Sequence, residues 1–178
     1  MQKRMCGVLS RSGGNARRAL LSVEPTLRSL LVSAYQSWLF NGVLGERIAG
    51  IDRMEPGDMA YKHENGACFL VEDAEAEQSR CVRMEISPTG PIWGYRMTAA
   101  RGEPGRRESA LLSGEGVPVD AFRNVLGARL KGERRPLRVV AEDARVTSGQ
   151  DEGGAYLELA FALPGGSYAT SVVREVTK

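Results

Sequence analysis

Residues 163–170, with the sequence LPGGSYAT, join an apolar alternating segment to a short apolar segment that runs to Val176. This pattern predicts a strand, a tight loop and the start of a helix. The glycines, Gly166 included, allow a sharp turn or the close approach of a ligand, and Ser167 is expected to cap the helix. Tyr168 would then lie beside backbone N–H groups that suit an anion or a polar ring. The alternative is an ordinary strand-loop-helix corner with a surface tyrosine.

The residues before this corner alternate between apolar and polar. Two sets of apolar residues are expected to face the same side of the two strands, and a turn is expected between them at residues 148–154. The first set is Leu137, Val139, Ala141 and Val146, and the second set is Leu157, Leu159, Phe161 and Leu163. The pattern predicts an antiparallel pair of strands. Because two strands are not stable alone, the pair is expected to pack on the first part of the chain or on strands that these residues do not include.

The first part of the sequence is mostly helical in pattern. The strongest helix spans 25–49. Its apolar face contains Leu27, Leu30, Leu31, Ala34, Tyr35, Trp38, Leu39 and Val43, and Gln36, Asn41 and Arg47 lie off that face or at its edge. A hairpin is expected around Asn65-Gly66, with strands at 59–61 and 67–71. Three further helices are expected at 72–84, 107–113 and 118–131. Residues 86–94 contain two prolines and two glycines and are expected to form a loop.

The composition suits a globular protein. The 178 residues are 42% hydrophobic and 26% charged, with a net charge of +2. No apolar run is long enough to cross a membrane, and the first residues lack the apolar core of a signal peptide. The three cysteines and the single histidine have no metal-binding spacing, so neither a zinc site nor a disulfide framework is expected. A reduced, cytoplasmic protein is expected.

The basic residues are unevenly distributed. They gather in residues 3–18, in residues 101–107, and in a third cluster of Arg129, Lys131, Arg134, Arg135 and Arg138. Such clusters can contact phosphates, but arginines can equally well serve only as solvated surface residues.

Several motifs together resemble the TruD family of tRNA pseudouridine synthases. They occur in the order of the family: SAYQSWLFN at 33–41, PTGPIWG at 88–94, RRPLR at 134–138, and LPGGSYAT at 163–170 followed by Val173-Arg174-Glu175. The resemblance covers about residues 25–178.

The resemblance implies an α+β fold in which a mostly helical domain is inserted into the mixed sheet of a pseudouridine synthase. Residues 1–20 would form a basic connecting segment, and residues 21–138 the inserted domain. Residues 139–178 would be the end of the catalytic domain, contributing an antiparallel pair of strands and a helix.

The family converts uridine-13 in the D arm of tRNA to pseudouridine, without a cofactor or metal. Tyr168 matches the aromatic residue expected to contact the base, and Arg174 could pair with the catalytic carboxylate and lower its pKa. Gly166 and Ser167 belong to the same motif and are expected to contact RNA. Three arginines are expected to serve the tRNA phosphates or the domain junction: Arg134, Arg135 and Arg138.

The sequence departs from the family at the nucleophile. The catalytic aspartate of the family lies in a Gly-x-Lys-Asp segment, which does not occur in these residues. The chain is therefore expected to be the C-terminal half of such an enzyme, active only with a separate N-terminal half. A non-catalytic RNA-binding module and an inactive remnant are the alternatives.

Overall fold

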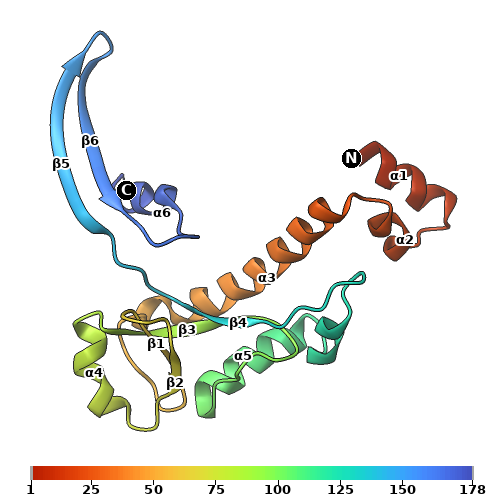
Figure 1. The fold of residues 1–178 in the computed structure, drawn as a ribbon, viewed down its shortest axis with the longest axis horizontal. Coiled ribbons are helices and arrows are strands. Elements are labelled where there is room, and N and C mark those ends of the chain that lie inside the picture. Colours follow the sequence, from red (N-terminus) through yellow and green to blue (C-terminus); the bar gives the residue numbers. More distant parts are fainter. Residues whose placement is uncertain (1, 178) are drawn as a thin grey trace. The chain divides into compact units, whose positions relative to one another are not determined.

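The computed structural model describes residues 2–177, and contacts within the chain divide it into two units. Unit 1 is Met1–Leu137, and unit 2 is Arg138–Lys178. Each unit is described by itself. Helices and antiparallel sheets occur in both parts of the fold (Figure 1), which confirms the predicted α+β class.

Unit 1 begins with two short helices, α1 (Gln2–Arg11) and α2 (Ala16–Leu21). The loop between them contains Gly13 and Gly14, both with positive φ. Asn15 caps α2, because its side-chain oxygen accepts a hydrogen bond of 2.9 Å from the backbone N–H of Arg18. That this basic segment serves as a connection remains a prediction.

The long helix α3 spans Pro25–Arg47 and continues into a 3-10 turn, η1 (Ile48–Gly50). Its buried face agrees with the prediction only in part: Leu39 and Val43 are buried as expected, but Gln36, Phe40 and Arg47 are buried as well. The expected core residues Tyr35 and Trp38 are 38% and 54% exposed, and their rings stack on each other. The reason is that α3 packs against β3 and α5 through the side that carries Leu39 and Gln36, where the Gln36 side chain donates a hydrogen bond to the Trp93 carbonyl.

A four-stranded antiparallel sheet of order β2-β1-β3-β4 lies beside α3 in unit 1. Its strands are β1 (Met59–Lys62), β2 (Cys68–Leu70), β3 (Ile86–Ile92) and β4 (Glu133–Pro136). The hairpin of β1 and β2 is confirmed, and Gly66 has the positive φ that its turn requires. The predicted helix at 72–84 is also confirmed as α4 (Ala74–Val82), which Asp73 caps.

The expectation of a loop at 86–94 is wrong. Residues 86–92 form the central strand β3, which pairs with β1 on one side and with β4 on the other. The residues from Ile86 to Pro91 are all buried. Pro88 and Pro91 have no backbone N–H to donate, but the stabilisation from burying β3 between two strands and α3 outweighs the loss of these hydrogen bonds. The carbonyl of Pro88 still accepts a hydrogen bond from the Leu137 N–H.

The predicted helix at 118–131 is also wrong. Helix α5 (Gly102–Gly114) is followed by a short 3-10 turn, η2 (Val119–Arg123), which buries Phe122 as expected. Leu126 and Gly127 then adopt positive φ, and Val125 and Ala128 exchange backbone hydrogen bonds across a tight turn. A helix cannot pass through this turn.

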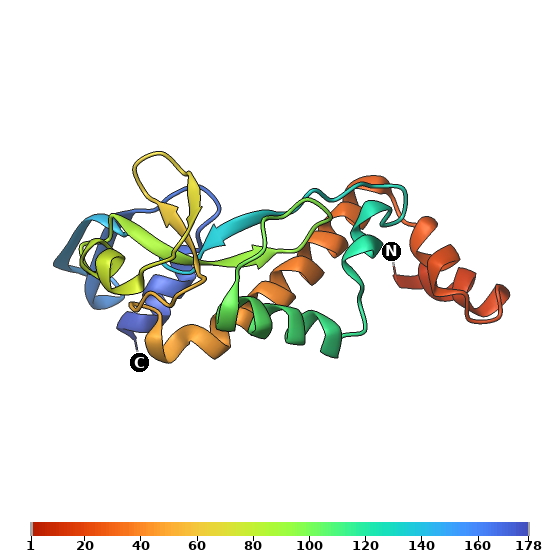
Figure 2. The ribbon, with the colours of Figure 1, turned by 90° about the horizontal axis from the view of Figure 1, so that it is seen from below.

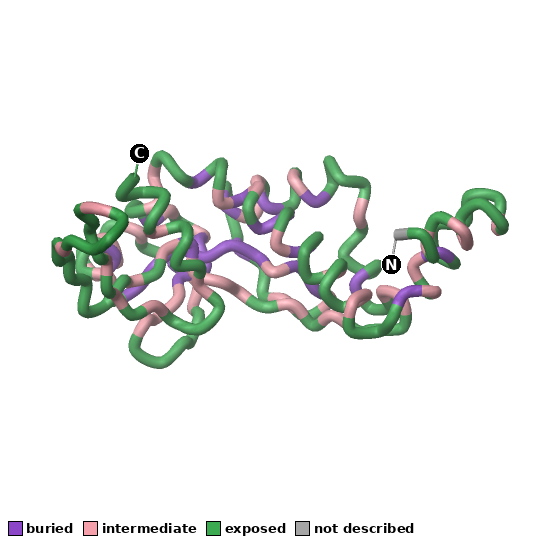
Figure 3. The backbone as a smooth tube through the Cα atoms, turned by 90° about the horizontal axis from the view of Figure 1, so that it is seen from above, coloured by how far each residue is buried: buried purple, intermediate pink, exposed green. Residues whose placement is uncertain are grey.

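Two apolar clusters form the core of unit 1, where the buried segments gather (Figure 3). The first joins the sheet to α4, and the second lies where α3 and α5 run side by side (Figure 2). The second cluster contains Leu39, Trp93, Leu112 and Phe122.

Unit 2 consists of a hairpin, β5 (Glu142–Asp151) and β6 (Gly154–Ala162), and a helix, α6 (Ala169–Val176). The predicted strand pair is confirmed, but its turn is only Glu152-Gly153, shorter than the expected 148–154. The strand β5 begins only at Glu142, after the chain has left β4 at Pro136. The expected strand residues Leu137, Val139 and Ala141 therefore lie between the two strands and outside β5. Most residues of unit 2 are exposed, Val146 and Leu157 among them.

Candidate functional site

The loop between β6 and α6 carries the motif of residues 163–170. Its turn is closed by a hydrogen bond of 3.1 Å from the Ser167 N–H to the Pro164 carbonyl, and Gly166 has a φ of 85°. The predicted Ser167 cap is wrong: Tyr168 is the N-cap residue, and no side chain caps α6. The helix begins only at Ala169, so Ser167 lies one position before the cap.

Tyr168 and Arg174 lie at the two ends of α6. The Tyr168 side chain is 74% exposed, and Arg174 is exposed in the last turn. Gly166 is exposed and Ser167 is half-buried. An exposed aromatic ring next to a glycine loop is open to a planar ligand such as a nucleobase.

Arg134 is placed differently from the prediction. Its side chain is 3% exposed and forms a bidentate ion pair with Glu108 of α5 at 2.7 and 2.9 Å. The same guanidinium donates to the hydroxyl and the carbonyl of Thr89 in β3. Arg134 therefore joins β4, β3 and α5, and a phosphate contact by this side chain is not supported because its donors are used inside the protein.

The other two arginines of this predicted set are half-buried. Arg135 follows Arg134 on β4, and its guanidinium lies 5.8 Å from the centre of the Phe40 ring. Arg138 is the first residue of unit 2. Residues 134 and 135 point to opposite faces of the sheet, as neighbours on a strand do, so the basic run does not form one surface.

A buried charge network lies at the end of α3, which sequence reasoning missed. Arg47 pairs with Asp58 at 3.0 Å and with Glu55, and Glu55 also pairs with Arg107. Burial raises the pKa of Asp58 to about 6, against the lowering effect of the Arg47 guanidinium. Arg47 follows the apolar Val43 by four residues, and residues four apart lie on the same face of a helix. This spacing could have predicted that Arg47 lies on the buried face.

A second feature that the sequence did not predict surrounds Tyr95, between β3 and α5. Three guanidinium carbons lie 5.7, 5.2 and 5.2 Å from the centre of its ring, those of Arg96, Arg123 and Arg129. Arg129 belongs to a basic cluster that was recognised in the sequence. The aromatic residue and Arg123 were not linked to it, because only the fold brings these segments together.

No cluster suited to a metal ion occurs within residues 2–177, and no helix there could cross a membrane. Unit 1 also has an apolar groove between α2, α3 and the turn after η2, lined by Leu20, Leu31, Tyr35 and Val125 among others. Its lining offers no set of ion ligands.

The family model described as "tRNA pseudouridine synthase D (TruD)" matches residues 1–176. The chain belongs to the TruD family of tRNA pseudouridine synthases. The match extends to the first residues, beyond the motifs that carry the resemblance in the sequence.

Three relatives illustrate the extent of the similarity. The chain is 48% identical over 170 residues to tRNA pseudouridine synthase D of Geobacter sulfurreducens, covering 96% of this chain and 41% of that protein. It is 44% identical over 157 residues to the protein of the same name from Thermus thermophilus, covering 87% and 41%. The crystal structure of a putative TruD from Methanosarcina mazei superimposes with a TM-score of 0.75 at 27% identity, covering 97% of this chain and 43% of that one. The chain thus spans about two fifths of the length of these TruD proteins.

Proposed function

We propose that this chain supplies part of a cytoplasmic tRNA pseudouridine synthase that converts uridine-13 of the D arm to pseudouridine. The observation that carries the proposal is the TruD family match over residues 1–176. The LPGGSYAT motif on an exposed loop of unit 2 supports it.

Tyr168 is proposed to stack on the target base after the base leaves the helical stack of the tRNA. Its exposed ring supports this role. Gly166 and Ser167 would let the RNA approach the loop closely. Arg174 would pair with the catalytic carboxylate and keep it ionised, since an opposite charge lowers the pKa of a carboxyl group.

The reaction is an isomerisation, so no atom is gained or lost. A catalytic aspartate attacks the nucleotide, the base is detached and turned, and it is rejoined to the ribose through carbon. The Gly-x-Lys-Asp segment that carries this aspartate in the family does not occur in the 178 residues. The proposed activity therefore requires a polypeptide that carries the segment.

The test is pseudouridine formation on an unmodified tRNA transcript. The assay uses this chain alone, the N-terminal part of the Geobacter sulfurreducens relative alone, and the two together. We expect product only from the mixture. Product from this chain alone would mean that one of its own carboxylates is the nucleophile. If the mixture gives no product, the proposal fails.

A second candidate is RNA binding without catalysis. The basic clusters in the sequence favour it, because they can contact phosphates. Salt-sensitive tRNA binding by a chain that never gives product, whatever N-terminal part is added, would support this candidate over the first.

A further inference from the structure

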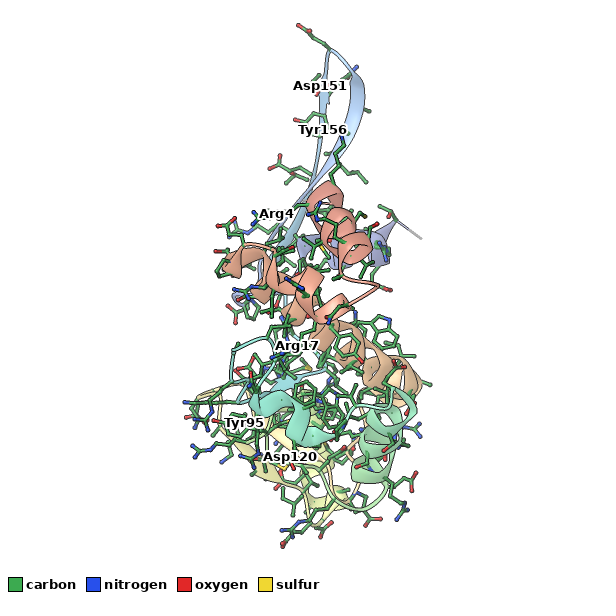
Figure 4. The ribbon with its side chains drawn as sticks, turned by 90° about the vertical axis from the view of Figure 1, so that its right-hand side faces the viewer. Arg4, Arg17, Tyr95, Asp120, Asp151 and Tyr156 are labelled. Atoms are coloured by element: carbon green, nitrogen blue, oxygen red, sulfur yellow. The ribbon has the colours of Figure 1, made fainter. Side chains whose placement is uncertain are left out.

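The Tyr95 cluster consists of Tyr95, Arg96, Arg123, Arg129 and the exposed Lys131. Figure 4 labels Tyr95, together with Asp120, which pairs with Arg123. The three arginine side chains converge on one half-buried ring. Each contact of this kind holds a guanidinium over the aromatic face, so the ring orients the positive charges.

Backbone hydrogen bonds hold the segments of the cluster together. The N–H groups of Tyr95 and Arg96 donate to the carbonyls of Leu130 and Lys131 at 3.0 and 2.9 Å. The two backbones approach so closely that a Cβ at Gly94 would lie 2.1 Å from the Gly132 nitrogen. The Leu130 N–H donates to the Phe122 carbonyl at 3.0 Å, which fixes η2 and its Arg123. The cluster is therefore preformed.

The cluster carries more positive than negative charge. Asp120 pairs with Arg123 at 2.8 Å. Arg96 and Arg129 are both exposed, and within residues 2–177 no ion pair joins either of them to a carboxylate. Guanidinium groups held together repel one another, and a bound anion would relieve that repulsion.

We propose that the Tyr95 cluster binds the phosphodiester backbone of RNA. Guanidinium groups bind phosphate oxygens through paired hydrogen bonds, and several of them on one preformed surface suit a chain of phosphates better than a single anion. The choice of RNA over other polyanions rests on the proposed function. Tyr95 acts as a positioning residue, because its ring lies beneath the guanidinium groups.

The experiment measures binding of the full chain to a fluorescent, unmodified tRNA transcript over a series of salt concentrations. The test variant replaces Arg96, Arg123 and Arg129 by Gln. The control variant makes the same change in charge at Arg53, Arg83 and Arg145, which are exposed arginines outside the Tyr95 cluster and outside the three basic clusters of the sequence. Thermal unfolding checks that both variants fold, and the single change Arg129→Gln serves if the triple variant does not.

We expect the triple change in the cluster to weaken binding at least about tenfold and to lower the salt slope by roughly 2, since each phosphate contact contributes about 0.7 to 0.9. Arg129→Gln alone should lower the slope by somewhat less than about 1. The control variant should bind like the unaltered chain. Equal affinity and slope in both triple variants would overturn the inference, as would a chain that binds no tRNA.

A poly-glutamate competitor separates RNA from an acidic protein partner. If poly-glutamate displaces tRNA as well as unlabelled tRNA does, the cluster is not an RNA site and the inference is overturned. The pseudouridine assay is independent of this test. Product formation with unchanged binding by the cluster variant would overturn only the inference, and cluster-dependent binding without product in any mixture would overturn only the proposed activity.

Discussion

At the scale of single residues, Arg134 shows that a basic residue in a basic run can have a structural role inside the fold. The sequence placed this arginine in a basic run that suits phosphates, whereas the fold uses it to neutralise Glu108 between β4 and α5. A basic run does not reveal which of its members point inward, because that depends on strand pairing. The exposed Tyr168 could be anticipated, since both interpretations of the loop placed this residue at an accessible position.

Arg134→Ala is expected to destabilise unit 1 by about 3 to 5 kcal/mol, because it leaves the buried Glu108 carboxylate without a partner. Denaturant unfolding measures the loss. The matched control is Arg106→Ala, whose side chain is 74% exposed and whose pair with Glu103 is expected to contribute less than about 1 kcal/mol. The double change Arg134→Met with Glu108→Leu should restore much of the stability. Equal losses at positions 134 and 106 would contradict the buried role of the pair.

Asp58→Asn is expected to change how stability depends on pH. The pKa of Asp58 is raised from 3.8 to about 6 in the folded chain, so the folded state binds a proton that the unfolded state does not between those values. The contribution of this group is fully present below pH 3.8 and is lost as the pH rises through 6, in total roughly 3 kcal/mol.

The free energy of unfolding, measured for both proteins from pH 4 to pH 7, tests this expectation. The unaltered chain should lose stability relative to Asp58→Asn as the pH rises through 6. A constant difference across the range would show that the folded and unfolded chains bind the same number of protons at position 58.

Tyr168→Ala is expected to impair turnover more than tRNA binding in the reconstituted enzyme. Loss of a stacked ring costs about 1 to 3 kcal/mol, which corresponds to roughly 5- to 150-fold in rate if the stack forms only with the flipped base. Tyr168→Phe keeps the ring and should remain close to the unaltered rate. Binding and turnover are measured side by side, and equal losses in the two would sink the proposed contact with the base.

At the scale of elements, the hairpin of β1 and β2 and the helix α4 could be predicted, because their signals are local. The Asn65-Gly66 turn and the Asp73 cap each act within a few residues. The strand β3 could not, because its local signals are those of a loop and only its two neighbouring strands make it a strand. The buried face of α3 was likewise decided by what packs on it, not by which of its faces is more apolar.

The two faces of the β5–β6 hairpin are expected to differ in how much they contribute to assembly with the N-terminal polypeptide. Leu157 lies opposite Ser148 and Glu158 opposite Thr147, so the two side chains point to opposite faces. Leu157 is 74% exposed, although its face also carries Val146 and Leu159. If this face packs on the rest of the catalytic sheet, Leu157→Ser should lower the pseudouridine yield of the mixture severalfold and leave unfolding of the chain nearly unchanged.

Glu158→Ser is the control on the opposite face, and it should leave the yield near that of the unaltered chain. Yield is measured at limiting concentrations of the two polypeptides, where assembly controls it. Equal yields for the two variants would mean that the apolar face of the hairpin takes no part in assembly.

At the scale of the whole molecule, the chain divides between a unit with its own apolar core and a unit that is almost entirely exposed. The α+β class and the TruD family could be predicted, since four motifs occur in the order of the family. The alternating pattern of residues 137–163 also predicted that the two strands pack on the first part of the chain or on further strands, because a hairpin alone does not bury enough surface. The Tyr95 cluster could not be predicted, since its arginines come from separate segments.

The most direct measurement is the amount and position of pseudouridine in a tRNA transcript as this chain is added to a fixed amount of the N-terminal part of a TruD relative. We expect no product without the chain, a yield that saturates when the two polypeptides are equal in amount, and pseudouridine at position 13. A yield that does not depend on the chain, or pseudouridine only at other positions, would contradict the proposal that this chain completes a TruD-type enzyme.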